Sequence, residues 1–299
     1  MAARCKILIP MPNLDFDPTE VCVPWKIMKA AGNDVVFATP DGSKGAADAI
    51  MLSGEGLDPW GFIPALRRIK LIGHFLRADK NARDCYQEML GDERFNNPLP
   101  YSDLSADDYD GILLPGGHAK RIKPYLESRK LQDVIAGFFD SETANGGHKP
   151  VGAICHGVVL PARAVSKKTG KSPLYGKKTT GLTWAQERAA WQLTRYFARF
   201  WDPHYFRTYL EEPGEAAGYR SVEAEVKRAL RDPEDFVEVD PAAPFYKIKT
   251  GIKRDNLSDE RPAWVVKDGN YISARWPGDA HTFAKRYVDL LDEVYGGKA

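Results

Sequence analysis

The stretch VGAICHG at residues 151–157 decides the fold, because it runs from an apolar strand directly into a turn of small residues. A helix is expected to begin near Val158. Cys155 would therefore stand on a sharp strand-to-helix elbow, where Gly157 leaves room for the turn. The N-terminal dipole and free N–H groups of that helix favour a thiolate, so we expect a lowered pKa for the Cys155 thiol. The alternative is an inert thiol, since free cysteine is commonly buried as a small hydrophobic residue.

A second apolar strand, at residues 111–114, ends in the glycine turn PGGH at residues 115–118. If the two strands are parallel and central, their carboxyl ends lie side by side, where ligands of open α/β sheets bind. The Gly117 N–H would then join the His156 N–H as an oxyanion hole facing the thiol. The alternative is an ordinary β-α turn that needs glycine for a positive φ.

Gly116 and His118 are expected to line the same pocket. His118 would orient a substrate oxygen or bind a metal, and its alternative is a polar position in a surface loop. The remaining histidines outside the elbow form no spacing typical of a metal site; they are His74, His148, His204 and His281. We therefore expect neither a metal nor a cofactor.

The segments around these turns alternate between strand and helix. Residues 6–9 are predicted as a strand, residues 18–31 as a helix after the N-cap Asp17, and residues 34–38 as a second strand. Further helices are expected at 131–140, 222–231 and 279–295, and further strands at 263–267 and 271–273. This alternation predicts an α/β fold, a three-layer sandwich with a mostly parallel central sheet and helices on both faces.

We expect one domain over residues 1–299, with insertions near 50–100 and 190–255. The first insertion contains a basic amphipathic segment around residues 66–76. Residues 184–209 are rich in large aromatic side chains, which predicts an amphipathic helix that packs on the body as a cap over the site. A helix lying on a membrane surface is the alternative, but the segment lacks a strongly basic polar face.

Composition limits the partners. The 42 Lys and Arg residues nearly balance the 41 Asp and Glu residues, which argues against nucleic acid and membrane surfaces as partners and favours a small, near-neutral substrate. No apolar run approaches the roughly 18 residues of a membrane span, and the start is too short for a secretory signal. The four cysteines form no C-x-x-C pair, which argues against zinc and favours a reducing cytoplasm.

Three motifs resemble those of the ThiJ/PfpI superfamily, whose flavodoxin-like fold is related to that of class I glutamine amidotransferases. These are the E-x-x-x-P pattern at residues 20–24, the P-G-G turn at 115–117 and the A-I-C-H-G elbow at 153–157. One branch of the superfamily contains glutathione-independent glyoxalase III and stress chaperones. The chain resembles this branch in the Gly-Gly-His form of the turn, in the Cys-His pair and in the closing segment at 266–277.

The resemblance implies roles for four residues. Cys155 would be the nucleophile and His156 the base, while Glu20 would be a protonated acid that donates a hydrogen bond to the sulfur. Glu187, after a T-G-x-T strand end, would be the carboxylate behind the imidazole. The alternative for Glu20 is the third residue of a capping box begun by Asp17, and for Glu187 a solvated position in the first turn of a helix.

The resemblance implies a cysteine-dependent enzyme. It favours a glutathione-independent glyoxalase, which converts a 2-oxoaldehyde into a 2-hydroxy acid, or a related deglycase. The alternatives are a cysteine amidase or peptidase, and a holdase chaperone or thiol redox sensor. A homodimer acting on a small carbonyl compound is expected. The sequence argues against a glutaminase, because the only late histidine, His281, is followed by Thr282 and Phe283 instead of the His-x-Glu pair.

Overall fold

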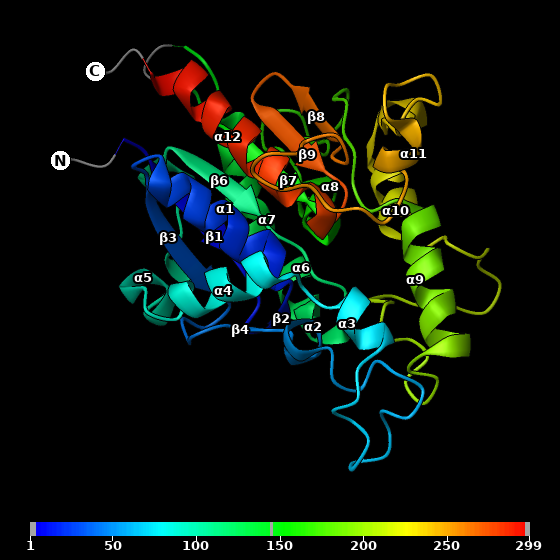
Figure 1. The fold of residues 1–299 in the computed structure, drawn as a ribbon. Helices are drawn as coiled ribbons and strands as arrows, with labels where there is room; N and C mark the ends of the chain where they lie inside the picture. Colours follow the sequence, from blue (N-terminus) through cyan, green and yellow to red (C-terminus); the bar gives the residue numbers. More distant parts are fainter. Residues whose placement is uncertain (1–3, 144–145, 297–299) are drawn as a thin grey trace.

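Seven strands form the central sheet of the computed structural model, which describes residues 4–143 and 146–296 (Figure 1). Six strands are parallel and β8 at one edge is antiparallel to its neighbour, so the predicted α/β fold with a mostly parallel sheet is confirmed. The order across the sheet is β5 (Leu99–Pro100), β3 (Asp34–Thr39), β1 (Lys6–Pro10), β6 (Gly111–Leu114), β7 (Val151–Ile154), β9 (Tyr271–Ala274) and β8 (Val265–Asp268). A small second sheet pairs β2 (Leu14–Phe16) with β4 (Ala46–Ala47).

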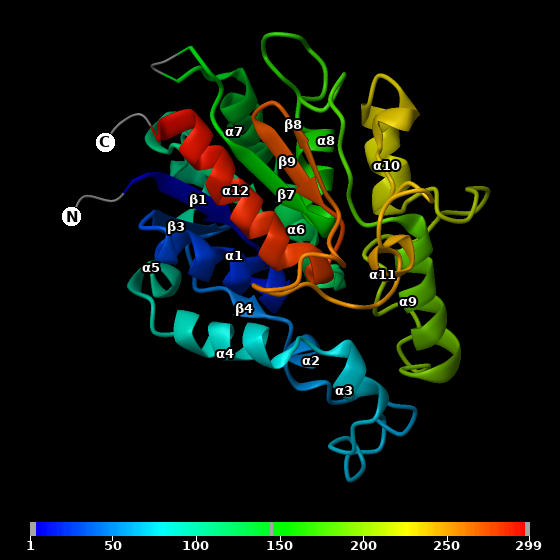
Figure 2. The ribbon, with the colours of Figure 1, turned by 45° about the horizontal axis from the view of Figure 1, so that its top comes forward.

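Alternate residues of each strand pack against different helical layers, as the two-residue period of a strand requires. In β6, Leu113 belongs to one apolar core, whereas Ile112 and Leu114 belong to the other. The first layer contains α1 (Pro18–Ala30), α4 (Lys80–Met89) and α12 (Ala280–Tyr295). The second contains α7 (Arg129–Asp140), α8 (Val159–Arg163) and α10 (Val222–Ala229), and Figure 2 shows α1 and α12 side by side on their face of the sheet.

The remaining elements are short, except for one helix that lies at the side of the body (Figure 1). That helix, α9 (Trp184–Phe197), begins where the sequence predicted the aromatic segment. The other α-helices are α2 (Ala49–Ser53), α3 (Ile72–Leu76), α5 (Glu93–Asn96), α6 (Lys123–Leu126) and α11 (Tyr246–Lys249). Single 3-10 turns are formed by Tyr101–Asp103, Ala106–Asp108, Lys120–Ile122, Cys155–Val158, Pro233–Asp235 and Pro277–Asp279.

Within the stretch near 50–100, α4 and β5 join the layers of the fold itself, while the irregular chain between α2 and α3 extends away from the sheet (Figure 2). The described part of the chain contains no helix that combines the length and the apolar character needed to cross a bilayer.

Replacing Gly152 in β7 by alanine should destabilise the fold by about 1–3 kcal/mol. The added Cβ would lie 2.9 Å from Cδ2 of Tyr287 and 3.1 Å from Cζ of Phe283, both of which are buried in α12. Denaturant unfolding followed by circular dichroism measures the change. Gly181→Ala is the matched control, because the nearest atoms there lie 3.5 Å away. Equal stabilities of the two variants would contradict this account of the packing.

Candidate active site

Cys155 stands on the elbow that the sequence predicted. Its φ is +58°, in the left-handed region that residues with a side chain seldom adopt. The turn is closed by Gly157, where an added Cβ would lie 2.2 Å from the carbonyl oxygen of Leu114. The strained backbone at Cys155 is therefore held by the tight passage of the chain past the end of β6. Such strain is found most often at functional sites.

Glu20, Cys155 and His156 come together around Gly116, at the adjacent ends of β6 and β7. An added Cβ on Gly116 would lie 2.8 Å from Oε2 of Glu20, 2.7 Å from the backbone nitrogen of His156 and 3.0 Å from Cβ of Cys155. The Gly116 N–H donates a hydrogen bond of 2.7 Å to Oε2 of Glu20. Only glycine fits at this point, and its amide is engaged by the carboxyl group.

Glu20 is fully buried in the first turn of α1 and does not form a capping box. The N-cap Asp17 accepts hydrogen bonds from the N–H groups of Thr19 and Glu20, but its own N–H donates to the carbonyl of Gly116. Burial, together with the nearby Asp17 carboxyl, raises the pKa of Glu20 well above its usual value. Burial therefore favours the protonated carboxyl, the state in which it can donate a hydrogen bond.

Burial reverses the pKa shift expected for Cys155. The thiol is only 5% exposed, and its pKa lies well above the ordinary value because of burial and, after it, the nearby Glu20 and Asp17 carboxyls. The His156 N–H lowers this pKa, as a helix N-terminus should, but its effect is smaller. The expected resting thiolate is thus wrong for this closed site, since the turn after Cys155 is too short to offset the loss of solvation.

His156 is positioned to accept the thiol proton. Its Nδ1 lies 3.5 Å from Sγ of Cys155, and its Nε2 lies 3.0 Å from Oγ1 of Thr208. That hydroxyl donates its hydrogen to the carbonyl oxygen of His118 at 2.7 Å, so it can only accept from the imidazole. The proton of the neutral ring therefore sits on Nε2. Burial lowers the pKa of His156 to about 3, so the ring is neutral and Nδ1 is free to act as a base.

The structure does not bring Glu187 to the imidazole. Its Oε1 lies 2.9 Å from Nε of Arg207, and its Oε2 accepts a hydrogen bond from the N–H of Val222. The Arg207 guanidinium is fully buried between the rings of Trp184 and Trp191, at 5.0 and 4.8 Å from their centroids. Thr208, whose hydroxyl contacts His156, directly follows Arg207. By pairing with Arg207, Glu187 therefore helps to hold Thr208 in place.

Thr208 was not predicted from the sequence. It lies in an irregular segment 52 residues from His156, and no motif surrounds it. The only sequence signal was the aromatic character of the segment, which predicted a cap without indicating a polar contact. The contact between Thr208 and His156 brings this segment into the site.

His118 forms part of the wall under the same segment. Its ring stacks on Phe206 with centroids 4.4 Å apart and meets the edge of Tyr205 at 4.8 Å. Gly117 has a φ of +152°, and its N–H makes no hydrogen bond with any residue in 4–143 or 146–296. The same described residues contain no group of three His, Cys, Asp or Glu side chains that could hold a metal.

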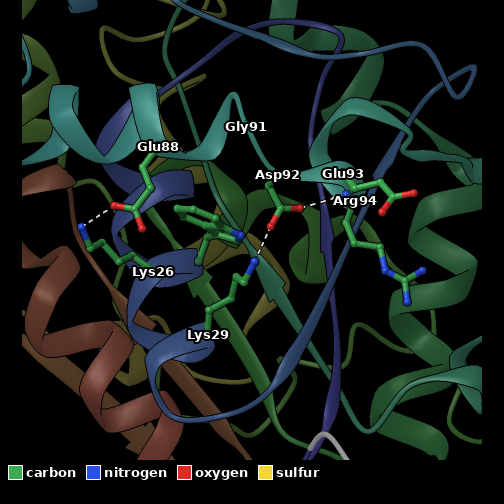
Figure 3. Close-up of a pocket in the computed structure, with 8 residues that line it drawn as sticks. Lys26, Lys29, Glu88, Gly91, Asp92, Glu93 and Arg94 are labelled. Atoms are coloured by element: carbon green, nitrogen blue, oxygen red, sulfur yellow. Dashed lines mark hydrogen bonds and ion pairs between the residues drawn. The ribbon is translucent and has the colours of Figure 1, made fainter.

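Two surface pockets lie away from these residues. One, of about 460 Å³, is lined by α1 and the region of α4 and α5, where Lys26 pairs with Glu88 and Lys29 with Asp92 (Figure 3). The other, of about 440 Å³, is lined by residues of β8, β9 and α12. Neither is lined by a residue that the sequence assigned to the site, and the Glu20, Cys155 and His156 side chains are themselves buried.

A sequence profile of proteins described as ThiJ/PfpI family-like matches residues 11–212. The chain is 26% identical over 194 residues to an uncharacterised protein of Schizosaccharomyces pombe, covering 63% of this chain and 67% of that protein. It is 33% identical over 96 residues to the glutathione-independent glyoxalase HSP31 of Saccharomyces cerevisiae, covering 31% and 38% respectively. A deglycase of Thermococcus kodakarensis is 27% identical over 142 residues, covering 45% of this chain and 79% of the deglycase.

Solved structures share the fold along most of the chain. Glyoxalase III from Candida albicans matches with a TM-score of 0.57 at 16% identity, covering 96% of this chain and 97% of that one. The 24 kDa rapid encystment protein of Francisella tularensis matches with a TM-score of 0.54 at 16% identity, covering 96% of this chain and 98% of that one. Identities this low indicate a common fold.

Acid should destabilise the protein through His156. Its pKa of about 3 in the folded state lies below the ordinary 6.5, so the unfolded chain binds the proton first. The neutral His156 therefore makes its full contribution to the free energy of unfolding above about pH 6.5. This contribution falls by about 1.4 kcal/mol per pH unit as the pH decreases toward about 3. Urea unfolding from about pH 7 to about pH 4 should show a shallower decline for His156→Gln than for the wild type. His74→Gln, at an exposed position, is the control, and identical declines in both variants would contradict the buried neutral imidazole.

Proposed function

Because the chain belongs to the ThiJ/PfpI-like family, we propose that it is a cysteine-dependent enzyme that converts a small 2-oxoaldehyde into a 2-hydroxy acid without glutathione. One observation carries the proposal. The Cys155 thiol faces the unprotonated Nδ1 of a neutral imidazole at 3.5 Å, beside a protonated Glu20 carboxyl and away from solvent. A nucleophile, a base and an acid are thus available together.

The first chemical step joins the sulfur to the aldehyde carbon. Sγ of Cys155 attacks that carbon as the thiol proton passes to Nδ1 of His156. The imidazole then gives this proton to the carbonyl oxygen, which leaves a hemithioacetal and a neutral ring. The protonated Glu20 carboxyl is placed to donate a hydrogen bond at this centre. The unengaged N–H of Gly117 supports the oxygen as its negative charge develops.

The second stage moves a hydrogen between adjacent carbons of the substrate. The His156 imidazole removes the proton from the former aldehyde carbon, giving an enediol, and returns a proton to the neighbouring carbon. The product is a 2-hydroxy thioester on Cys155. Water then breaks the carbon–sulfur bond, releasing the 2-hydroxy acid and restoring the thiol. One carbon is oxidised and its neighbour is reduced, so the sequence needs no external oxidant or reductant.

The enclosure of the site favours a small carbonyl compound over the alternatives. A thiol that is 5% exposed under a packed segment does not admit a folded polypeptide, which argues against a peptidase. A raised thiol pKa and low exposure also argue against a redox sensor, since oxidation follows thiolate character and access. Relatives named glyoxalase and deglycase support aldehyde chemistry at this thiol.

Incubation of the purified protein with methylglyoxal, without glutathione, tests the proposal. The wild type should consume methylglyoxal and form lactate, whereas Cys155→Ser should form none, because its hydroxyl is a much weaker nucleophile. Cys22→Ser is the matched control, since Cys22 is also buried but lies in α1, where no histidine of the described residues forms a hydrogen bond with its sulfur. Absence of lactate with the wild type, or equal rates for Cys155→Ser, would refute the proposed activity.

The hydroxyl of Thr208 should act as a positioning group for the base. In Thr208→Val the imidazole loses its Nε2 partner and its tautomer is no longer held, so kcat should fall by roughly 100-fold while KM changes little. Thr208→Ser keeps the hydroxyl and should recover most of the rate. Equal kcat values for the valine and serine variants would contradict this role.

A further inference from the structure

Two segments of the chain combine basic and apolar residues with a complete absence of acidic ones. Residues 59–78 contain four Lys or Arg residues and no Asp or Glu. Residues 188–201, from α9 and the turn after it, contain three Arg residues and again no Asp or Glu. The positive charge of these two segments is not evident from the near balance of charge over the whole chain.

The two segments meet in space. The ring of Phe62 lies 5.7 Å from that of Phe200 and 5.4 Å from that of Trp201. Both views show the chain between α2 and α3 projecting beyond the body on the side where α9 ends (Figures 1 and 2). We call residues 59–78 and 188–201 together the basic apolar patch.

Large apolar side chains of the patch are exposed to solvent. Phe75 is 82% exposed, Phe197 67% and Leu71 61%. Single exposed apolar residues are ordinary, but a concentration of them on neighbouring segments marks a binding surface. The exposed set comprises Phe62, Ile63, Leu66, Ile69, Leu71, Phe75, Tyr196, Phe197 and Phe200.

Positive charge in the patch is only partly neutralised. A Cβ added to Gly56 would lie 3.0 Å from Nη1 of Arg199 and 3.3 Å from Nε of Arg67, so two guanidinium groups converge there. Arg199 pairs with Asp202, whereas Arg67 and Arg68 form no ion pair within the described residues. The unpaired Arg67 and Arg68 beside exposed apolar side chains favour an anionic partner with an apolar interior.

We propose that the basic apolar patch docks on the surface of an anionic lipid bilayer. Its exposed aromatic and aliphatic side chains enter the boundary between headgroups and acyl chains, and its cations contact the acidic headgroups. A second copy of the chain is a poorer partner, because a symmetric contact through this patch sets cations against cations. Nucleic acid would satisfy the charges and leave the aliphatic side chains in water.

Flotation of the full chain with lipid vesicles tests the proposal. The protein should bind vesicles of about 30% phosphatidylserine in phosphatidylcholine at least tenfold more tightly than vesicles of phosphatidylcholine alone, and salt near 0.5 M should reduce the binding. The triple substitution R67Q/R68Q/K70Q should weaken binding by about a hundredfold, at about fivefold per charge. Substituting the exposed Phe75→Ser and Phe197→Ser should weaken it at any salt concentration.

The triple substitution K167Q/K168Q/K171Q is the matched control, since it removes the same charge from exposed positions outside the patch. It should bind anionic vesicles nearly as well as the wild type, and circular dichroism should show that every variant is folded. Equal loss in the two triple variants would reduce the effect to net charge and overturn the proposal. Absence of vesicle binding would also overturn it. So would a dimer in light scattering that becomes a monomer when Phe75 and Phe197 are substituted, because the patch would then bind a second copy of the chain.

Discussion

The candidate site depends on the close approach of three chain segments at the carboxyl ends of β6 and β7. Gly116 has room for no side chain, because an added Cβ would collide with Glu20 of α1 and with the adjacent residues Cys155 and His156 of the elbow. Gly157 is equally confined by the Leu114 carbonyl. These two contacts force the backbone of Cys155 into a positive φ and direct its side chain toward the imidazole and the carboxyl. The parallel pairing of β6 and β7 makes this approach possible, so the fold and the site share one steric requirement.

Burial then determines the protonation state of the site. It raises the pKa of Glu20 and of Cys155 and lowers that of His156, so burial favours the neutral form of all three groups. A neutral site avoids the large free-energy penalty of isolated charges in a low-dielectric interior. Nucleophilicity then arises when the thiol proton moves to Nδ1 as a bond to substrate forms. The cap takes part in this arrangement, because Thr208 determines which imidazole nitrogen is free.

Local patterns in the sequence predicted the parts of the site that lie on regular elements. The elbow at Cys155, the glycine turn at 115–118 and the sheet that brings them together all follow from strand and turn signals. The sign of the Cys155 pKa shift could not be predicted, because it depends on how completely the cap excludes water. Glu187 was placed behind the imidazole by its position after a T-G-x-T segment, but a buried arginine 20 residues further on attracts it instead. The hydroxyl of Thr208 left no signal, since a single threonine in an irregular segment has no periodicity or spacing to interpret.

The tautomer of His156 is the most direct test of this account. Side-chain nitrogen NMR of the labelled protein distinguishes a protonated from an unprotonated imidazole nitrogen, and comparison with a His156→Gln variant assigns the signals. We predict a neutral ring with the proton on Nε2 and an unprotonated Nδ1 throughout the range from about pH 8 to about pH 5, because the pKa of this residue lies near 3. A ring protonated on Nδ1, or a charged imidazolium at neutral pH, would contradict the proposal that His156 accepts the thiol proton.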